Sequence, residues 1–380
     1  MKNFIVFLLA VVVALLLIAG CEEKFDTSTL PNPDANTSPG DTNYVEITPP
    51  YGGFETPVSV MVGNDQLIYI ADYDRNEIVM MDAAGVILKR RSVPHPVSIS
   101  QNLKLDLYVC GETMAQNGRD TIGAIYRIYL ARFDTTIAGQ DTSLLINHDL
   151  ENAPMHIIRK EAERPKRRFV GVGIFPDNEF IVARTGPDNT SFVDPDTRVI
   201  SFDKKDKMIT PRGELITRAT GGTAITDINQ LTGIAVFPSS RNFIVLQSSA
   251  GAAYGAIWMV YESRADFTGW VPRFDPSKAE QRSTDFIRTY RFMYPTAAAV
   301  DRRRSDVFIV DAGLDSVFKF DRNGRFKSES FGKAKTQSEL LPGLKNPRGI
   351  AYSNDCTIYI ADTGNKIIRR FKLSVQTTCF

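Results

Sequence analysis

The chain has 380 residues, with 45 Lys or Arg residues against 44 Asp or Glu residues. This even balance supplies no basic stripe of the kind that nucleic-acid binding needs, and we therefore expect no nucleic-acid partner. The length exceeds that of a typical domain, but all-β propellers and barrels often fold as one unit of this size.

The N-terminus has the pattern of an export signal. An apolar run over residues 4–19 follows Lys2 and is too short to span a bilayer, which needs about 20 apolar residues. The run ends in Ile18-Ala19-Gly20-Cys21, which resembles the lipobox of bacterial lipoproteins, in which the cysteine carries the lipid. The resemblance implies a lipoprotein signal peptide over residues 1–20 and a membrane anchor on Cys21. An ordinary signal peptide and an uncleaved anchor are the alternatives.

The residues after the cysteine predict a flexible connection to a folded body. Residues 21–43 are rich in Asp, Thr, Pro, Asn and Ser and cannot bury enough apolar surface to fold, so we expect a lipid-anchored tether. Glu22-Glu23-Lys24 resembles the charged export tag of surface lipoproteins in Bacteroidota. In other Gram-negative bacteria the same residues fit an outer-membrane lipoprotein that faces the periplasm, so both locations in the cell envelope stay open.

From Pro57 onward the sequence repeats a strand-turn-strand unit. Three copies place a β-branched residue six positions after an Asp and a large apolar residue nine positions after it. These copies begin at Ile70-Ala71-Asp72, Ile309-Val310-Asp311 and Ile360-Ala361-Asp362. An identical register in separate copies is typical of a repeat architecture, and the short strand-like segments favour an all-β fold.

A further strand precedes each repeat, and six such strands can be aligned. Their first residues are Pro57, Pro96, Phe169, Leu231, Pro295 and Pro347. All six have a small residue at the third position: Ser59, Ser98, Gly171, Gly233, Ala297 and Gly349. Strands that converge on a narrow axis need small side chains there, so the pattern predicts a six-bladed β-propeller over residues 44–380. Tyr44–Ile47, which alternates like a strand, is expected to complete the last blade and cover its edge.

The segments 57–88, 295–326 and 347–373 resemble NHL repeats, whose core is an apolar-Ala-Asp-Thr-Gly-Asn strand-turn-strand unit. Asp362-Thr363-Gly364-Asn365 matches the family turn closely, while the two other turns keep its length only. Three further repeats are divergent. The resemblance implies an NHL-type propeller, and the long interval in residues 130–168 leaves a seventh blade as an alternative.

The repeated aspartates are interpreted as structural. In the NHL pattern this Asp belongs to the repeat and accepts backbone N–H groups of the following turn, whereas a catalytic acid is usually needed once. We therefore expect Asp72, Asp311 and Asp362 to stabilise the repeats.

A candidate binding site follows from the expected topology, because the loops that precede the innermost strands surround one mouth of the channel. The residues concerned are His95, Arg168, Gln230, Tyr294, Asn346 and, one position inside its strand, Arg348. This mixed polar ring suits a protein, peptide or glycan ligand. The alternative is that these are ordinary loop residues.

The ring contains one histidine and no acid, which bears on catalysis. Lactonase-like propellers gather carboxylates around calcium, and amidating-lyase-like NHL proteins use histidines around zinc, but neither set is matched here. We therefore predict no catalytic residue, metal or cofactor. A binding or scaffolding module of the cell envelope is favoured over a hydrolase or lyase with its active site at the channel mouth.

Two features outside the ring complete the expectations. With Cys21 lipidated, Cys356 and Cys379 lie in the same C-terminal segment and are a possible disulfide outside the cytoplasm. The aromatic-rich stretches 269–274 and 290–294 are interpreted as blade packing, with a recognition surface as the alternative.

Overall fold

The computed structural model describes residues 43–133, 144–146, 149–191, 193–209, 215, 227–281, 284–332 and 343–374. The predicted signal peptide, Cys21 and all of the predicted tether except residue 43 lie outside these residues, as does Cys379. Within the described ranges, no helix is both long and apolar enough to cross a membrane.

The described chain forms six antiparallel sheets of three or four strands that follow one another along the sequence, and one separate two-stranded sheet that is described below. The first holds β2 (Pro57–Val62), β3 (Ile68–Asp72), β4 (Glu77–Met81) and β5 (Ile87–Ser92), and the second holds β6 (Ser98–Gln101), β7 (Leu107–Met114), β8 (Thr121–Ile128) and β11 (Met155–Lys160). The third holds β12 (Arg168–Ile174), β13 (Phe180–Thr185), β14 (Arg198–Phe202) and β15 (Met208–Ile209). The fourth holds β16 (Leu231–Val236), β17 (Phe243–Gln247), β18 (Ala256–Ser263) and β19 (Thr268–Pro272).

The last two sheets depart from this simple order. The fifth has three strands, β20 (Pro295–Val300), β21 (Val307–Asp311) and β22 (Ser316–Phe320), and the backbone of Phe331 pairs with Val317 beyond its outer edge. The sixth combines β23 (Pro347–Tyr352), β24 (Ile358–Asp362) and β25 (Ile367–Leu373) with β1 (Tyr44–Tyr51) from the start of the domain. The described chain also contains two short 3₁₀ turns, η2 (Asp285–Ile287) and η3 (Thr363–Asn365).

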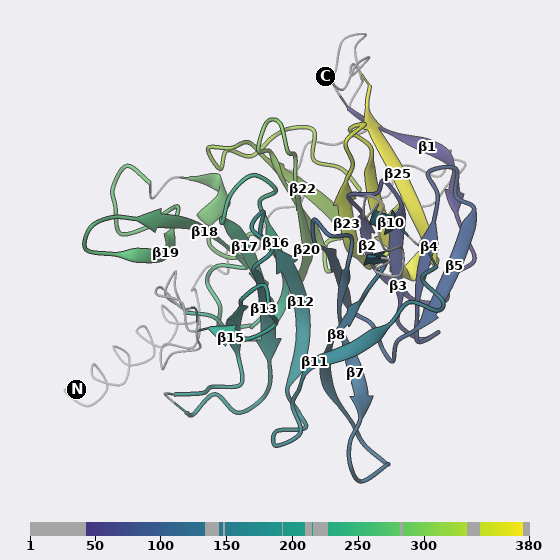
Figure 1. Cartoon of the computed structure of the whole chain (residues 1–380). Helices are drawn as coiled ribbons and strands as arrows, with labels where there is room; N and C mark the ends of the chain where they lie inside the picture. The colour runs from purple at the N-terminus through teal and green to yellow at the C-terminus, as the bar shows by residue number, and fades with distance from the viewer. Residues whose placement is uncertain are drawn as a thin grey trace, which may run out of the picture.

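These sheets are the blades of a six-bladed β-propeller, as the sequence predicted. Figure 1 shows innermost strands such as β12, β16 and β20 side by side in the middle of the molecule, with β5, β15 and β19 at its periphery. The apolar faces of neighbouring blades pack against each other: one core cluster joins Tyr69 of β3 to Leu107 of β7, and another joins Phe308 of β21 to Ile358 of β24.

The predicted repeat spacing is explained by strand pairing. In three blades, the proline that opens the innermost strand lies directly opposite the repeat aspartate of the second strand. The pairs are Pro57 with Asp72, Pro295 with Asp311 and Pro347 with Asp362. The spacing between these two residues is therefore the length of one hairpin.

The ring is closed by a strand from each end of the propeller. β1 pairs antiparallel with β25, with Tyr44 opposite Leu373 and Ile47 opposite Arg370, which confirms the predicted role of residues 44–47. The Arg369 guanidinium binds the Glu46 carboxylate across this seam, with 2.8 Å between Arg369 Nε and Glu46 Oε1. The edge of the last blade is thus covered by the chain itself.

The alternative of a seventh blade in residues 130–168 is wrong. β9 (Ala131–Phe133) and β10 (Leu144–Ile146) form a separate two-stranded hairpin. The next strand, β11, is the outer strand of the second blade, where it pairs with β8. The interval is long because this hairpin is inserted between the third and fourth strands of one blade.

Three of the predicted small residues are glycines that lie against the backbone of the next blade. A Cβ on Gly171 would lie 2.7 Å from the Ile234 nitrogen, and one on Gly233 would lie 2.4 Å from the Thr296 carbonyl oxygen. A Cβ on Gly349 would lie 2.8 Å from the Ser59 Cα. Only glycine permits this approach, because backbone atoms cannot move aside as a flexible side chain can.

The cysteines of the described chain differ in state. Cys110 is a free, buried thiol whose pKa is raised by burial. Cys356 is disulfide-bonded, and its partner lies outside the described residues. The pairing of Cys356 with Cys379 therefore stays a prediction.

A substitution at Gly233 tests the close packing of the innermost strands. We expect Gly233→Ala to lower the free energy of unfolding by about 1–3 kcal/mol, the usual cost of overpacking. Chemical denaturation of the purified protein measures this, with Gly52→Ala as the control, since nothing lies within 4 Å of a Cβ at Gly52. Equal stability of the two variants would contradict the packing described here.

Candidate functional site

The channel site begins with a bulge that recurs in the innermost strands. In five blades the pairing of the first two strands shifts near the start of the innermost strand and skips one of its residues. The skipped residues are Val58, Val170, Thr232, Thr296 and Arg348. A bulge leaves its extra residue unpaired and changes the direction of its side chain, and all five residues line a central cavity.

At the level of the bulges, the lining is apolar in the first three blades and polar in the last three. Val58 and Val170 belong to the first and third blades, and Val97, which precedes the innermost strand of the second blade, also lines the cavity. Thr232, Thr296 and Arg348 occupy the equivalent positions of the fourth, fifth and sixth blades. This ring was missed in the sequence, where only Arg348 was selected, because a bulge has no clear local sequence signal.

The cavity has a volume of about 710 Å³ and opens at one end of the channel. Two kinds of loop surround that opening: those that precede an innermost strand and those that join the second and third strands of a blade. The cavity-lining residues of these loops include Thr56, Tyr73, Asp74, His95, Tyr294, Asn346 and Thr363. The strands β7, β12 and β13 add Glu112, Arg168 and Thr185. The volume is in the range of ligand-binding clefts.

The structure brings five of the six predicted mouth residues to this cavity. They are His95, Arg168, Tyr294, Asn346 and Arg348. Gln230 is exposed just before β16 and is absent from the cavity lining, although its backbone has the same left-handed conformation as that of His95 and Asn346. Equivalent positions in the repeat therefore do not all contribute a side chain to the channel.

Glu112 joins two of the predicted residues. One carboxylate oxygen lies 3.1 Å from His95 Nδ1, and the other accepts a hydrogen bond of 2.9 Å from Arg168 Nε. Burial alone would raise the pKa of Glu112, but hydrogen bonds from Thr121 and His95 and the charge of Arg168 outweigh it and hold the pKa below its ordinary value. Glu112 is therefore ionised and holds the side chains of His95 and Arg168 in place.

Tyr73 lies next to this group. Its ring stacks on the His95 ring with 4.7 Å between the centroids. Burial raises the pKa of Tyr73, the nearby carboxylates Glu112 and Asp74 raise it further, and the guanidiniums of Arg168 and Arg348 act in the opposite direction. The phenol stays protonated at neutral pH and is a hydrogen-bond donor within the field of both arginines.

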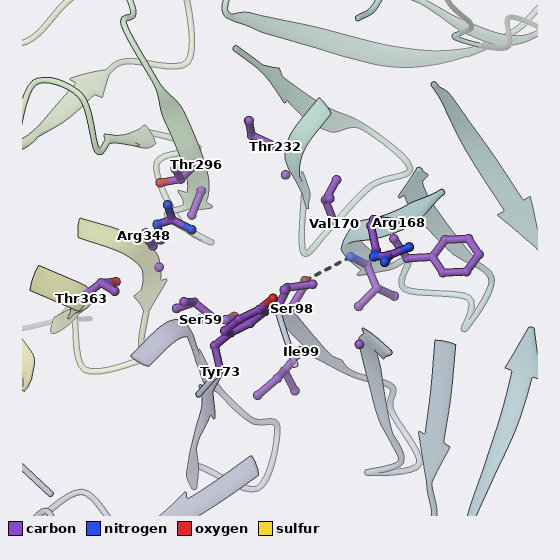
Figure 2. A pocket seen from close by; sticks show the side chains of 18 of the residues that line it. Ser59, Tyr73, Ser98, Ile99, Arg168, Val170, Thr232, Thr296, Arg348 and Thr363 are labelled. Atoms are coloured by element: carbon purple, nitrogen blue, oxygen red, sulfur yellow. Dashed lines mark hydrogen bonds between the residues drawn. The ribbon is translucent and has the colours of Figure 1, made fainter. Parts of the chain in front are cut away.

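The two arginines of the cavity differ in their partners. Arg168 is paired with Glu112, whereas Arg348 forms no ion pair within the described part of the chain. The Nε of Arg348 is buried without a hydrogen-bond partner, and its guanidinium carbon lies 5.9 Å from the centre of the Tyr294 ring. Figure 2 shows Arg168 and Arg348 on opposite sides of the cavity, with Tyr73 between them in this view.

Hydrogen bonds between blades hold the lining strands. Ser98 Oγ accepts the backbone N–H of Val172 at 3.1 Å, a contact that is drawn in Figure 2. Thr232 donates its hydroxyl to the Pro295 carbonyl at 2.5 Å, and Thr363 donates to the Pro57 carbonyl at 2.6 Å. Each hydroxyl keeps an acceptor lone pair for a ligand.

The repeat aspartates are fully buried and bind backbone N–H groups. Asp72 accepts those of Glu55 and Thr56, and Asp362 accepts that of Lys345, all in the loop before the innermost strand of the same blade. Asp311 accepts N–H groups in the corresponding loop at Met293 and Tyr294 and also in its following turn at Gly313 and Leu314. These carboxylates thus fix the backbone of the mouth loops to the second strands of their blades.

The two aromatic-rich stretches behave differently. Trp270 is buried and stacks on Phe175, and Phe274 packs edge-on against Trp258, so the first stretch contributes to blade packing. In the second stretch, Tyr290 and Met293 are exposed by 67% and 68%, and Tyr294 by 38% at the cavity rim. Packing therefore does not account for the whole of residues 290–294.

Among the described residues, no group of three or more His, Cys, Asp or Glu side chains is arranged to hold a metal ion. The two carboxylates of the cavity, Asp74 and Glu112, are both hydrogen-bonded: Asp74 accepts the Thr56 hydroxyl, and Glu112 has the partners given above.

No protein-family model matches this sequence, and no curated protein matches it. The fold is nevertheless similar to solved propeller structures. An auxiliary nutrient binding protein from Bacteroides ovatus is 12% identical, with a TM-score of 0.56 over 88% of this chain and 78% of the other. One from Bacteroides thetaiotaomicron is 13% identical, with a TM-score of 0.54 over 84% and 70%.

An enzyme shares the same fold. A gluconolactonase from Xanthomonas campestris is 12% identical, with a TM-score of 0.54 over 88% of this chain and 90% of the other. At these identities the likeness extends to the fold alone, which hosts binding proteins and enzymes alike.

Removal of the Glu112 charge tests the role of this residue at the mouth. We expect Glu112→Gln to destabilise the protein at pH 7 by about 1–3 kcal/mol, since the amide has no charge to pair with Arg168 and only one of the two acceptor oxygens. Because the pKa of Glu112 is below its ordinary value of about 4.3, this contribution is complete above that pH and is lost as the pH falls through the lower folded-state pKa.

Urea unfolding at neutral and acidic pH measures this effect. The difference between wild type and Glu112→Gln should shrink in acid, whereas Glu55→Gln, at a half-exposed carboxylate, should have little effect at either pH. A difference that is unchanged at low pH would show that Glu112 does not act through its charge.

Proposed function

We propose that this protein is a lipid-anchored binding module of the cell envelope and that its NHL-type propeller takes a ligand into the channel mouth. The observation that carries the proposal is the open cavity with one guanidinium, that of Arg348, that has no carboxylate partner in the described chain. Other arginines, such as Arg370, also have a buried Nε without a hydrogen-bond partner, but Arg348 lines the open cavity, where a ligand can reach its guanidinium. A charged hydrogen bond from Arg348 to an anionic ligand group would stabilise the complex.

The lining supports recognition of a polar ligand. Hydroxyl or amide side chains line the cavity from five different blades, at Thr56, Ser98, Thr232, Thr296 and Asn346. A few fixed polar groups beside an apolar wall are typical of ligand sites, because the apolar wall contributes affinity and the polar groups fix orientation. The proposed ligand is a peptide, a glycan or a protein segment that enters the mouth.

The place of the protein in the cell follows from the N-terminal pattern. A lipid on Cys21 and a tether up to residue 43 would hold the propeller close to a membrane, with the outer membrane as the proposed location. Two solved neighbours are auxiliary nutrient binding proteins from Bacteroides, which is consistent with a binding role at the envelope.

A catalytic function has one specific observation in its favour. His95 is oriented by Glu112, as a general base is oriented by a carboxylate, and it lies at the same mouth. A hydrolase or lyase is therefore the second candidate, and the test of the proposal includes it.

Ligand binding can be tested with full-length protein in detergent on arrays of oligosaccharides and peptides. We expect binding that Val170→Trp abolishes, because the indole fills the cavity from the third blade without removing a polar group. Leu103→Trp, at an exposed turn at the opposite end of the channel, is the control and should bind as wild type does.

Two outcomes would contradict the binding module. Binding that survives in Val170→Trp would place the ligand outside the mouth. Conversion of a bound compound to product, lost in His95→Ala, would favour the hydrolase or lyase.

The anchor is tested separately in cells. We expect wild-type protein to incorporate radiolabelled palmitate and to sediment with membranes, whereas Cys21→Ser should remain unlabelled and soluble after export. Cys110→Ser is the control, since this thiol is buried in the propeller. Equal membrane association of the two variants would argue against lipid on Cys21.

A further inference from the structure

The charges of the cavity point to a particular kind of ligand. Two guanidiniums and two carboxylates line it, at Arg168, Arg348, Asp74 and Glu112. Because Glu112 pairs with Arg168 and lies beside His95, Arg348 is the cation left without a carboxylate in the described chain. The four charges balance over the whole cavity, and Asp74 accepts the Thr56 hydroxyl. Arg348 is therefore the position at which one negative group of a ligand can be bound.

The same distribution of guanidiniums and carboxylates disfavours ligands with several adjacent negative charges. A phosphate cluster or a polyacidic peptide would bring further negative charges close to Asp74 and Glu112. Like charges in a partly desolvated cavity repel, and the only other cavity guanidinium is already neutralised. One carboxylate, bound by the planar fork of Arg348, fits the charge and the donor geometry.

The remainder of the lining favours a sugar as the carrier of that carboxylate. The cavity lining also includes Thr232, Thr296 and Asn346. The two threonine hydroxyls donate to the Pro295 and Pro347 carbonyls and can accept from sugar hydroxyls, whereas the Asn346 amide can both donate and accept. The half-exposed ring of Tyr294 lies beside the guanidinium, and Tyr290 is largely exposed four residues earlier. Aromatic rings at a rim offer flat apolar surfaces with a polar edge, which suit the faces of a sugar ring.

We infer that the mouth binds an acidic glycan, with the carboxylate of a uronic acid residue on Arg348 and a neighbouring sugar against Tyr294. The inference rests on the proposed binding function and specifies its ligand class. Tyr73, a protonated phenol that lines the same cavity, is a further hydrogen-bond donor for the ligand. The valine side of the cavity, at Val58, Val97 and Val170, contacts the less polar face of the ligand.

The first measurement uses wild-type protein only. Oligogalacturonate, oligoguluronate and hyaluronan fragments are titrated by calorimetry, together with the methyl esters of the same oligosaccharides. We expect at least one acid to bind, and its ester to bind about 10- to 100-fold more weakly, which is the range for loss of a charge-assisted hydrogen bond. An ester that binds as tightly as its acid would overturn the inference.

The second measurement uses a matched pair of arginine variants. Arg370, in the same blade, also has a buried Nε without a hydrogen-bond partner and stacks on a tyrosine, Tyr51, but it is absent from the cavity lining. We expect Arg348→Gln to lose the preference for acid over ester, while Arg370→Gln keeps it. Arg348→Lys retains the charge and should keep part of the preference, so a folding defect in one variant leaves the test intact.

The outcomes separate this inference from the proposed function. If neutral oligosaccharides bind and Val170→Trp abolishes their binding, the proposed binding function stands, but the inferred contact between a carboxylate and Arg348 is wrong. If glutamate peptides bind more tightly than every uronate, the inference that the ligand is a glycan is wrong. If none of these compounds and no array member binds at the mouth, both the function and the inference fail.

Discussion

The close approach of six innermost strands around one axis is the constraint on which the channel depends. Where Gly171, Gly233 and Gly349 lie, the backbone of the next blade occupies the space of a missing Cβ. One residue earlier in the same strands, the pairing skips a position and the side chain lines the channel. The packing of the blades and the placement of the candidate ligand contacts are therefore two consequences of the same few residues.

The mouth is held by groups that have no contact with a ligand. Buried aspartates of the second strands accept hydrogen bonds from N–H groups of the loops before the innermost strands. Asp311 fixes the backbone of Tyr294 in this way, and Asp72 fixes that of Thr56. Preorganised loops lower the entropic cost of binding, because fewer side chains have to be ordered when the ligand arrives. The repeat thus holds the mouth loops in place, and the divergent residues at its bulges and loops line the proposed site.

Much of the fold could be predicted from the sequence, because comparison of the repeated segments with one another shows which residues occupy equivalent positions in the strands. The spacing from Pro347 to Asp362 is one hairpin, and the alternation at Tyr44–Ile47 is that of the strand that closes the ring. The residues of the candidate site were harder to predict from the sequence. Glu112 was not selected, since its link to Arg168 joins residues 56 positions apart, and the bulged residues Thr232 and Thr296 read as ordinary strand positions.

The most direct test of the channel site is a crystal structure of the protein with the uronate oligosaccharide that binds most tightly. We expect its carboxylate at hydrogen-bonding distance from the Arg348 guanidinium, with a sugar ring against Tyr294. A ligand at the outer face of a blade or at the opposite end of the channel, with Arg348 still without an anionic partner, would contradict the proposed site.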